Sequence, residues 1–132
     1  MTIAAYKRTI RESESPRQIE RRILSNITGR LEAEAQAFDG AAYLADRTRI
    51  LAAGLRGTLR DNQAIWIALR NDLAQPANAL PPALRASLIS IALWVERQTL
   101  QVLGGAAGIR ALAEVNNNII AGLSHGSPGP RG

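Results

Sequence analysis

The chain has 132 residues, with 16 basic and 11 acidic side chains, a formal net charge of +5, no cysteine and one histidine. This length suits a single domain with one core, and the missing cysteines exclude disulfides, thiolate metal ligands and cysteine nucleophiles. The lone His125, in a stretch rich in Gly and Pro, argues against a metal centre or an acid–base dyad, because both draw on several converging side chains.

Residues 1–14 are predicted to form a mobile arm without a secretion signal. Lys7, Arg8 and Glu12 fall where a signal peptide has its apolar core. The longest apolar run, residues 88–95, contains a serine and is far shorter than the roughly 20 residues that cross a bilayer. We therefore expect a cytoplasmic protein without membrane insertion.

A folded domain is predicted over residues 15–123, and its first helix begins at Pro16. Ser15 can accept a hydrogen bond from a first-turn amide, and proline suits the first helical position because no amide proton is left unpaired there. The helix is expected to end where Asp39 and Gly40 follow. Apolar residues recur every four positions along it: Ile19, Ile23, Ile27, Leu31 and Ala35.

Two further helices are predicted, over residues 41–56 and 58–74. Thr58 follows Gly57 and has an acidic residue three positions later, which is the pattern of a capping box at a helix start. A single helix kinked near Gly54 and Gly57 is the alternative, since an isolated glycine costs a helix only about 1 kcal/mol.

A stiff turn and a long helix come next. Pro76 and Pro81 cannot continue a helix, and Asn78 is suited to an Asx turn. The helix predicted over residues 82–103 is apolar on two sides, which is typical of a central helix. One stripe holds Leu84, Leu88, Ile91, Val95 and Val102, and the other holds Ile89, Leu93, Leu100 and Leu103.

The last predicted helix follows Gly104 and Gly105. Residues 124–132 are Gly-, Ser- and Pro-rich and are expected to be disordered. No segment alternates with a period of two, so we predict an all-α, single-domain bundle of four to five helices around the central helix 82–103. The apolar face of the last helix holds Ile109, Leu112, Val115, Ile119 and Leu123.

Catalysis is not expected. The carboxylates are scattered along helix faces next to arginines, as with Asp46 and Arg49 or Glu96 and Arg97, and such pairs are usually solvated. No paired carboxylates and no phosphate-binding glycine loop stand out. The sequence therefore predicts a non-enzymatic protein without a cofactor or a metal.

Direct nucleic-acid binding is the weaker alternative. Arginines on the first predicted helix and on the segment from residue 41 to 74 could contact phosphates, but acidic residues dilute the stripe. Trp66 and Trp94 are interpreted as core residues, which leaves few aromatic side chains for base stacking. The basic candidates are Arg17, Arg21, Arg22, Arg47, Arg49, Arg56 and Arg60.

Four residues are candidate partner contacts. Arg85 either pairs with Asp72 across the turn, which we favour, or faces a partner. Asn116, Asn117 and Asn118 weaken the last helix by roughly 1–2 kcal/mol relative to alanine. Either one of them bonds the backbone of the preceding loop, or the run forms a polar contact site for another protein, and both interpretations stay open at this stage.

An ordered set of motifs resembles one family. Residues 72–95 read DLAQPANALPPALRASLISIALWV, residues 15–20 read SPRQIE, residues 62–66 read NQAIW, and residues 109–123 read IRALAEVNNNIIAGL. Together they resemble the FlaF flagellar biosynthesis regulators of alphaproteobacteria.

The resemblance implies a small cytoplasmic protein that has no cofactor and binds flagellin. It further implies support for flagellin secretion through the flagellar export apparatus, and joint action with the translational regulator FlbT to match flagellin synthesis to flagellum assembly. The alternative function is an RNA-binding regulator of flagellin mRNA.

Overall fold

The computed structural model describes residues 16–125, and over that range the secondary structure is helical. This confirms the all-α, single-domain prediction. A π-helical turn, η1, lies between the helices α3 and α4. The elements are α2 (Pro16–Asp39), α3 (Leu44–Ile50), η1 (Leu51–Leu55), α4 (Arg56–Leu73), α5 (Pro82–Leu103) and α6 (Ile109–His125).

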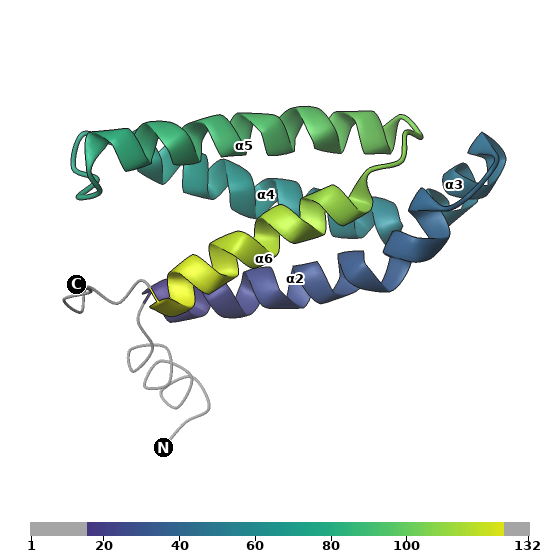
Figure 1. Cartoon of the computed structure of the whole chain (residues 1–132), viewed down its shortest axis with the longest axis horizontal. Coiled ribbons are helices and arrows are strands. Elements are labelled where there is room, and N and C mark those ends of the chain that lie inside the picture. The colour runs from purple at the N-terminus through teal and green to yellow at the C-terminus, as the bar shows by residue number, and fades with distance from the viewer. Residues whose placement is uncertain (1–15, 126–132) are drawn as a thin grey trace, which may run out of the picture.

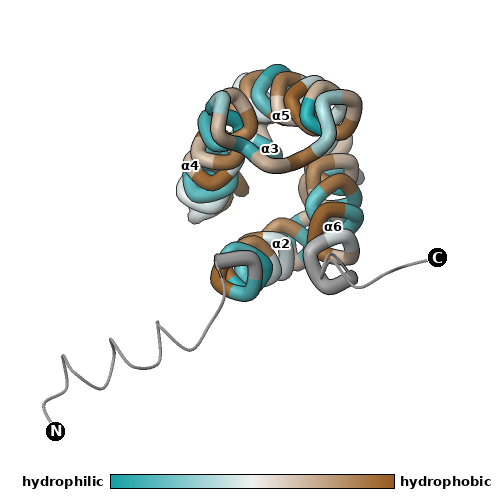
Figure 2. Tube along the Cα trace, turned by 90° about the vertical axis from the view of Figure 1, so that its left-hand side faces the viewer, coloured by the Kyte–Doolittle hydropathy of each residue, from teal (hydrophilic) through white to brown (hydrophobic). Residues whose placement is uncertain are grey.

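The four long helices run alternately up and down the bundle (Figure 1). α6 packs against α2, and α5 packs against α4, each pair being antiparallel. Viewed from one end, the four helices surround a common core and none occupies its centre (Figure 2). The helix predicted to be central, α5, therefore forms one side of the bundle, and only one of its apolar stripes faces inward.

Large apolar side chains from every long helix fill the core. Burying each of them contributes roughly 1.5–3 kcal/mol relative to leaving it exposed. Trp66 is buried as predicted, and Trp94 is half-buried against the same core. The fully buried large residues include Leu24, Leu31, Phe38, Leu51, Leu59, Val95, Val102, Ile109 and Leu112.

The predicted helix boundary at Gly57 was wrong. The backbone from Leu44 to Leu73 is helical except at Gly54, where two helical stretches meet at a kink. At this kink the Arg56 amide donates to the Leu51 carbonyl, five residues earlier, as in a π turn. Gly54 takes up the distortion with φ 152°, a conformation that side chains with a Cβ rarely adopt. The structure therefore matches the alternative prediction of a helix that is kinked near Gly54.

Tertiary packing explains why no helix starts at Thr58. Thr58 lies inside α4 and is buried, and its neighbours Leu55 and Leu59 are both in the core. A capping threonine would have to leave the helical conformation, which would pull these leucines out of the core.

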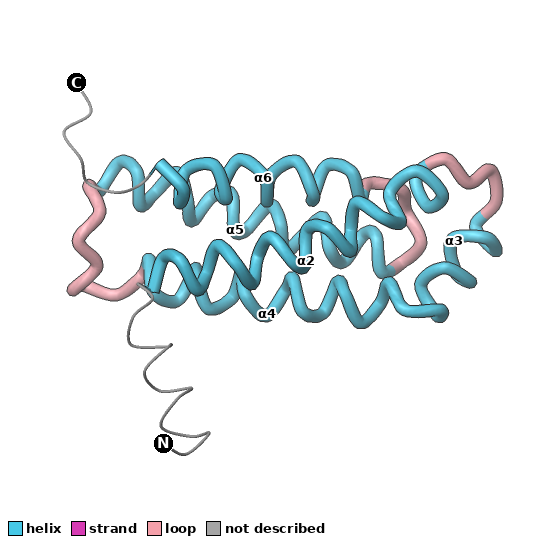
Figure 3. The backbone as a smooth tube through the Cα atoms, turned by 90° about the horizontal axis from the view of Figure 1, so that it is seen from below, coloured by secondary structure: helices cyan, strands magenta, loops and turns pink. Residues whose placement is uncertain are grey.

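The connections lie at the two ends of the bundle, with the α4–α5 turn at one end and the turns before α3 and α6 at the other (Figure 3). In the α4–α5 turn, the Leu80 amide donates to Asn78 Oδ1 over 3.0 Å, which confirms the Asx turn. Asn78 Nδ2 also donates to the carbonyl and carboxylate of Asp72, both over 3.3 Å.

The predicted arm, residues 1–14, lies outside the described residues. The first two residues of the predicted tail, Ser124 and His125, belong to α6, and the rest of the tail is not described. Over residues 16–125 no helix combines the length and the apolar character needed to span a membrane.

Candidate functional site

An open groove of about 760 Å³ lies between α2 and α4. These two helices pack less closely than the α2–α6 and α4–α5 pairs do, and they border the same side of the bundle in Figure 2. Ile23 is 46 % exposed in it, whereas Ile27 is buried against the core. The lining residues are Arg22, Ile23, Asn26, Ile27, Arg30, Asp61, Ala64 and Ile65.

Charged residues cross one end of this groove. Arg30 Nη2 on α2 and Asp61 Oδ2 on α4 lie 3.1 Å apart. Both side chains are about half exposed, and an exposed ion pair of this kind contributes only about 0–1 kcal/mol. A ligand can therefore displace this ion pair at little cost in free energy, or add its own charged groups next to Arg30 and Asp61.

The groove combines an apolar floor with polar edges. Ile23, Ile27 and Ile65 supply the floor, and Arg22, Asn26 and Arg30 stand along one edge. This is the surface that an amphipathic helix needs, because its apolar face can be buried while its polar flanks meet charged side chains.

A buried polar network joins α4 to α6 next to the core. Trp66 Nε1 donates to Asn116 Oδ1 over 2.9 Å, and Asn116 Nδ2 donates to Asn62 Oδ1 over 2.8 Å. Asn62 and Asn116 are both fully buried, so these bonds replace water that the amides have lost. The Asn62 Nδ2 group has no hydrogen-bond partner.

A comparison with protein families identifies the family of the chain. A family profile described as flagellar protein FlaF matches residues 2–123 of the chain. The chain belongs to the FlaF family. It is therefore a flagellar protein, and the family match takes in residues 2–14 as well as the described bundle. No curated protein and no solved structure shows a significant match.

The FlaF-like motifs quoted from the sequence meet in the buried network of this bundle. Asn62 and Trp66 come from the NQAIW segment, and Asn116 comes from the closing segment. Their meeting was not predicted, because the two segments lie some fifty positions apart. The signal available in the sequence was an asparagine on an otherwise apolar helix face.

Of the three predicted asparagine contacts, Asn116 is a core residue and offers no surface to a partner. It bonds side chains of α4, and not the backbone of the preceding loop. Asn117 and Asn118 are exposed on α6, and Asn117 Nδ2 donates to Glu32 Oε2 over 3.3 Å. For this FlaF-family chain, these two remain predicted contacts.

Arg85 bridges the α4–α5 turn, but not through Asp72. Its Nε donates to the Leu73 carbonyl over 3.0 Å and its Nη2 to the Gln75 carbonyl over 3.2 Å. The last carbonyls of a helix have no partners inside the helix, and the guanidinium supplies a partner for the carbonyl of Leu73, the last residue of α4. The Gln75 carbonyl, in the turn, also accepts from the Asn78 amide over 3.0 Å. The predicted Arg85–Asp72 ion pair was wrong, but Arg85 does bridge the turn, as predicted.

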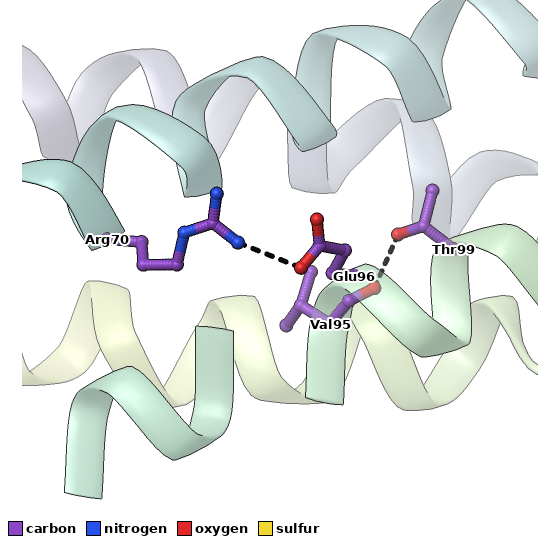
Figure 4. Close-up of polar contacts among 4 residues, drawn as sticks. All are labelled: Arg70, Val95, Glu96 and Thr99. Atoms are coloured by element: carbon purple, nitrogen blue, oxygen red, sulfur yellow. Dashed lines mark hydrogen bonds and ion pairs between the residues drawn. The ribbon is translucent and has the colours of Figure 1, made fainter. Parts of the chain in front are cut away.

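An ion pair joins α4 to α5, and its glutamate was predicted to pair with a different arginine. Glu96 Oε2 accepts from Arg70 Nη1 over 2.8 Å, and not from its neighbour Arg97 (Figure 4). The Thr99 hydroxyl nearby donates to the Val95 carbonyl over 2.7 Å (Figure 4). The cavity beside these residues is about 10 Å³, the lower limit for one water molecule, and is too small for a ligand.

Two of the candidate phosphate-binding arginines are held within the FlaF fold. Arg47 donates from Nε to the Gly105 carbonyl over 2.6 Å and from Nη1 to the Ala41 carbonyl over 2.8 Å. Arg49 pairs with Asp46 over 2.6 Å, as predicted. The Arg47 bonds tie α3 to the neighbouring turns, whereas the Arg49–Asp46 pair lies within α3. Both contacts reduce the charge that this end of the stripe can offer to a phosphate chain.

Asp39 has a role that the sequence did not reveal. Its Oδ1 accepts from the Gly108 and Ile109 amides over 2.8 and 2.9 Å, and its Oδ2 accepts from the Arg110 amide over 2.9 Å. Partial burial alone would raise the pKa of Asp39, but these three amides and the Arg110 charge outweigh it and lower the pKa. The end of α2 thereby caps the start of α6.

Proposed function

We propose that this FlaF-family chain is a cytoplasmic flagellar biosynthesis regulator that binds flagellin, supports its secretion and couples its synthesis to flagellum assembly. Two findings support the proposal: membership of a flagellar family and the open α2–α4 groove. The proposed role is one of binding and requires neither catalysis nor a cofactor.

The groove is the single observation that carries the proposal. An amphipathic flagellin helix would lay its apolar face on Ile23, Ile27 and Ile65, and acidic residues on its flanks would meet Arg22 and Arg30. A covered apolar face cannot pair with another flagellin subunit. Binding in the groove would therefore keep the subunit unpolymerised until it is exported.

Calorimetric titration of flagellin monomer into the purified protein tests the proposal. Ile23→Asp puts a charge on the groove floor, and we expect the affinity to fall by about tenfold or more. Ile67→Asp is the matched control, because Ile67 is 37 % exposed, close to the 46 % of Ile23, and lies on α4 beside α5, outside the groove.

Two outcomes would count against flagellin binding in the groove. One is the absence of heat and of co-elution at tens of micromolar protein, which is roughly the weakest affinity expected of a working complex. The other is an equal loss of affinity in both variants. An affinity for flagellin mRNA that falls steeply with salt, without any binding to flagellin, would favour the RNA-binding regulator instead.

Coupling to translation and export requires further partners. We propose a FlbT-type translational regulator and a component of the export apparatus, with Arg85, Asn117 and Asn118 as the contacts to examine first. Asn117 and Asn118 lie on α6, which does not line the groove. A bundle occupied by flagellin could therefore still present them to a second protein.

A further inference from the structure

Residues 16–125 leave the floor of the α2–α4 groove open. Ile23 is 46 % exposed there, and an apolar floor between two helices is a surface that a further amphipathic segment can cover. The α2 residues that line the groove run from Arg22 to Arg30. At 1.5 Å per helical residue this is a length of about 12 Å.

The sequence before α2 carries an apolar stripe of matching length. Ile3, Tyr6 and Ile10 are spaced by three and four residues, which places them on one face of a helix, with Arg8 on the opposite face. From Ile3 to Ile10 such a helix is about 10 Å long. The FlaF profile match begins at residue 2, so this stretch is part of the family sequence.

The connection to α2 is long enough to bring this stripe back onto the groove. Ile23 follows Pro16 by seven residues, which is about 10 Å along α2. Packed helices lie 8–10 Å apart, so Ile10 placed next to Ile23 would be about 14 Å from Pro16. The six chain steps through residues 11–15 span up to about 20 Å. The segment can therefore turn there and run antiparallel to α2.

We propose that residues 2–14, within the predicted arm, dock in the α2–α4 groove of the same chain. The stripe of Ile3, Tyr6 and Ile10 then faces the isoleucine floor of the groove. The docked segment covers the surface that we propose for flagellin, so it closes the groove until a partner helix replaces it. This regulatory role rests on the proposed function, whereas the docking itself does not.

Covalent attachment favours this occupant over any free one. A segment joined by a short connection acts at an effective concentration of about 1 mM. With a Kd of only about 0.1 mM it would be docked for about nine-tenths of the time. A free helix at about 1 µM would have to bind about 1,000-fold more tightly than the segment to occupy the groove equally.

Charge leaves the segment replaceable. Lys7 flanks its apolar stripe, and the α2 edge of the groove carries Arg22 and Arg30. Charges of the same sign do not favour docking. The acidic flanks proposed for the flagellin helix would instead meet these arginines, so that helix gains contacts that the segment lacks.

Thiol labelling of the full chain tests the docking without any partner. The chain has no cysteine, so Asn26→Cys puts a single thiol in the groove, and Ser25→Cys puts one on the exposed surface of α2 outside it. The stripe variant, Ile3→Ser with Ile10→Ser, removes two anchors, and Arg8→Ser is its matched control on the opposite face. We expect the stripe variant to speed maleimide labelling of Asn26→Cys by about tenfold. Labelling of Ser25→Cys should not change, and Arg8→Ser should change neither rate.

Three results would overturn the docking. The first is equal labelling of Asn26→Cys with and without the stripe substitutions. The second is a rise at Ser25→Cys as large as that at Asn26→Cys, because it would mean that α2 itself has loosened. The third is protection that grows with protein concentration, because it would come from another copy of the chain.

Titration with flagellin separates this inference from the proposed function. If both hold, the stripe variant should bind flagellin about tenfold more tightly than Arg8→Ser does, because no segment has to be displaced. Protection of Asn26→Cys by the segment without any binding of flagellin would support the docking and refute the proposed function. Equal flagellin affinity in the two variants, with Asn26→Cys unprotected, would refute the docking and leave the proposed function standing.

Discussion

Replacing Asp39 is the change whose consequence the structure defines best. The Asp39 carboxylate accepts hydrogen bonds from the amides of Gly108, Ile109 and Arg110, so one side chain at the end of α2 satisfies three of the four amides that the start of α6 leaves unpaired. Asp39→Ala removes all three acceptors at once. We expect both α6 and its contact with α2 to be weakened.

The size of the effect follows from that geometry. Loss of a helix N-cap costs about 0.5–2 kcal/mol, and a hydrogen bond to a charged group contributes about 1.5–3 kcal/mol. Because water can replace part of the contact at this half-buried site, we expect Asp39→Ala to lower the free energy of unfolding by about 2 kcal/mol, or the Tm by roughly 5–10 °C. Asp39→Asn keeps one acceptor and should lose about half as much.

Urea unfolding followed by circular dichroism measures this loss. Asp46→Ala is the matched control, because Asp46 also accepts a bond at the start of a helix but only from exposed Arg49, and should cost less than about 1 kcal/mol. Equal stability of the two variants would refute the capping role of Asp39.

The pH dependence gives a second check. The pKa of Asp39 is lowered in the folded chain by the Gly108, Ile109 and Arg110 amides and by the Arg110 charge, against the opposing effect of burial. A lowered folded pKa adds stability that is present above the unfolded value near 3.9 and is lost as the pH falls through the folded pKa. The stability gap between wild type and Asp39→Asn should therefore narrow in acid, and a gap that widened there would contradict this assignment.

Three further substitutions probe other parts of the fold. Asn116→Ala leaves the Trp66 indole without its acceptor and should cost about 2–4 kcal/mol by urea unfolding; a loss below 1 kcal/mol would show that the network is not tightly held. Arg85→Lys keeps the charge but cannot reach two carbonyls at once, and should lower stability by about 1 kcal/mol in thermal unfolding without changing the fold. Gly54→Ala should cost about 1–2 kcal/mol because of its positive φ, whereas Gly57→Ala, in helical backbone with open space around it, should be neutral or stabilising; equal effects of the two would argue against the π-turn geometry.

The sequence correctly predicted features of the fold that depend on residues close together along the chain, such as helix starts and tight turns. Pro16 and Pro82 each mark a helix start that the structure confirms, and Asn78 closes the turn between α4 and α5 through its own neighbours. At Gly57 the same kind of local signal failed, because burial of the flanking leucines outweighs the preference of glycine and threonine for a helix end.

Contacts between distant segments could not be predicted from one sequence. Asp39 caps a helix about seventy residues further along the chain, and Asn116 bonds Trp66 across fifty residues. Both look locally like something else: Asp39 like part of a helix stop, and Asn116 like a weak position in a surface helix. The groove between α2 and α4 depends on how closely two helices pack, which no residue pattern sets by itself.

Site-specific photo-crosslinking from the groove tests the central claim, that flagellin binds between α2 and α4. A crosslinker at Asn26, which lines the groove, is compared with one at exposed Ser25, which does not. Our account predicts that Asn26 captures flagellin through an amphipathic helical segment and that Ser25 captures little. Capture of flagellin from Ser25 but not from Asn26, or from neither position in a mixture where the two proteins co-elute, would contradict it.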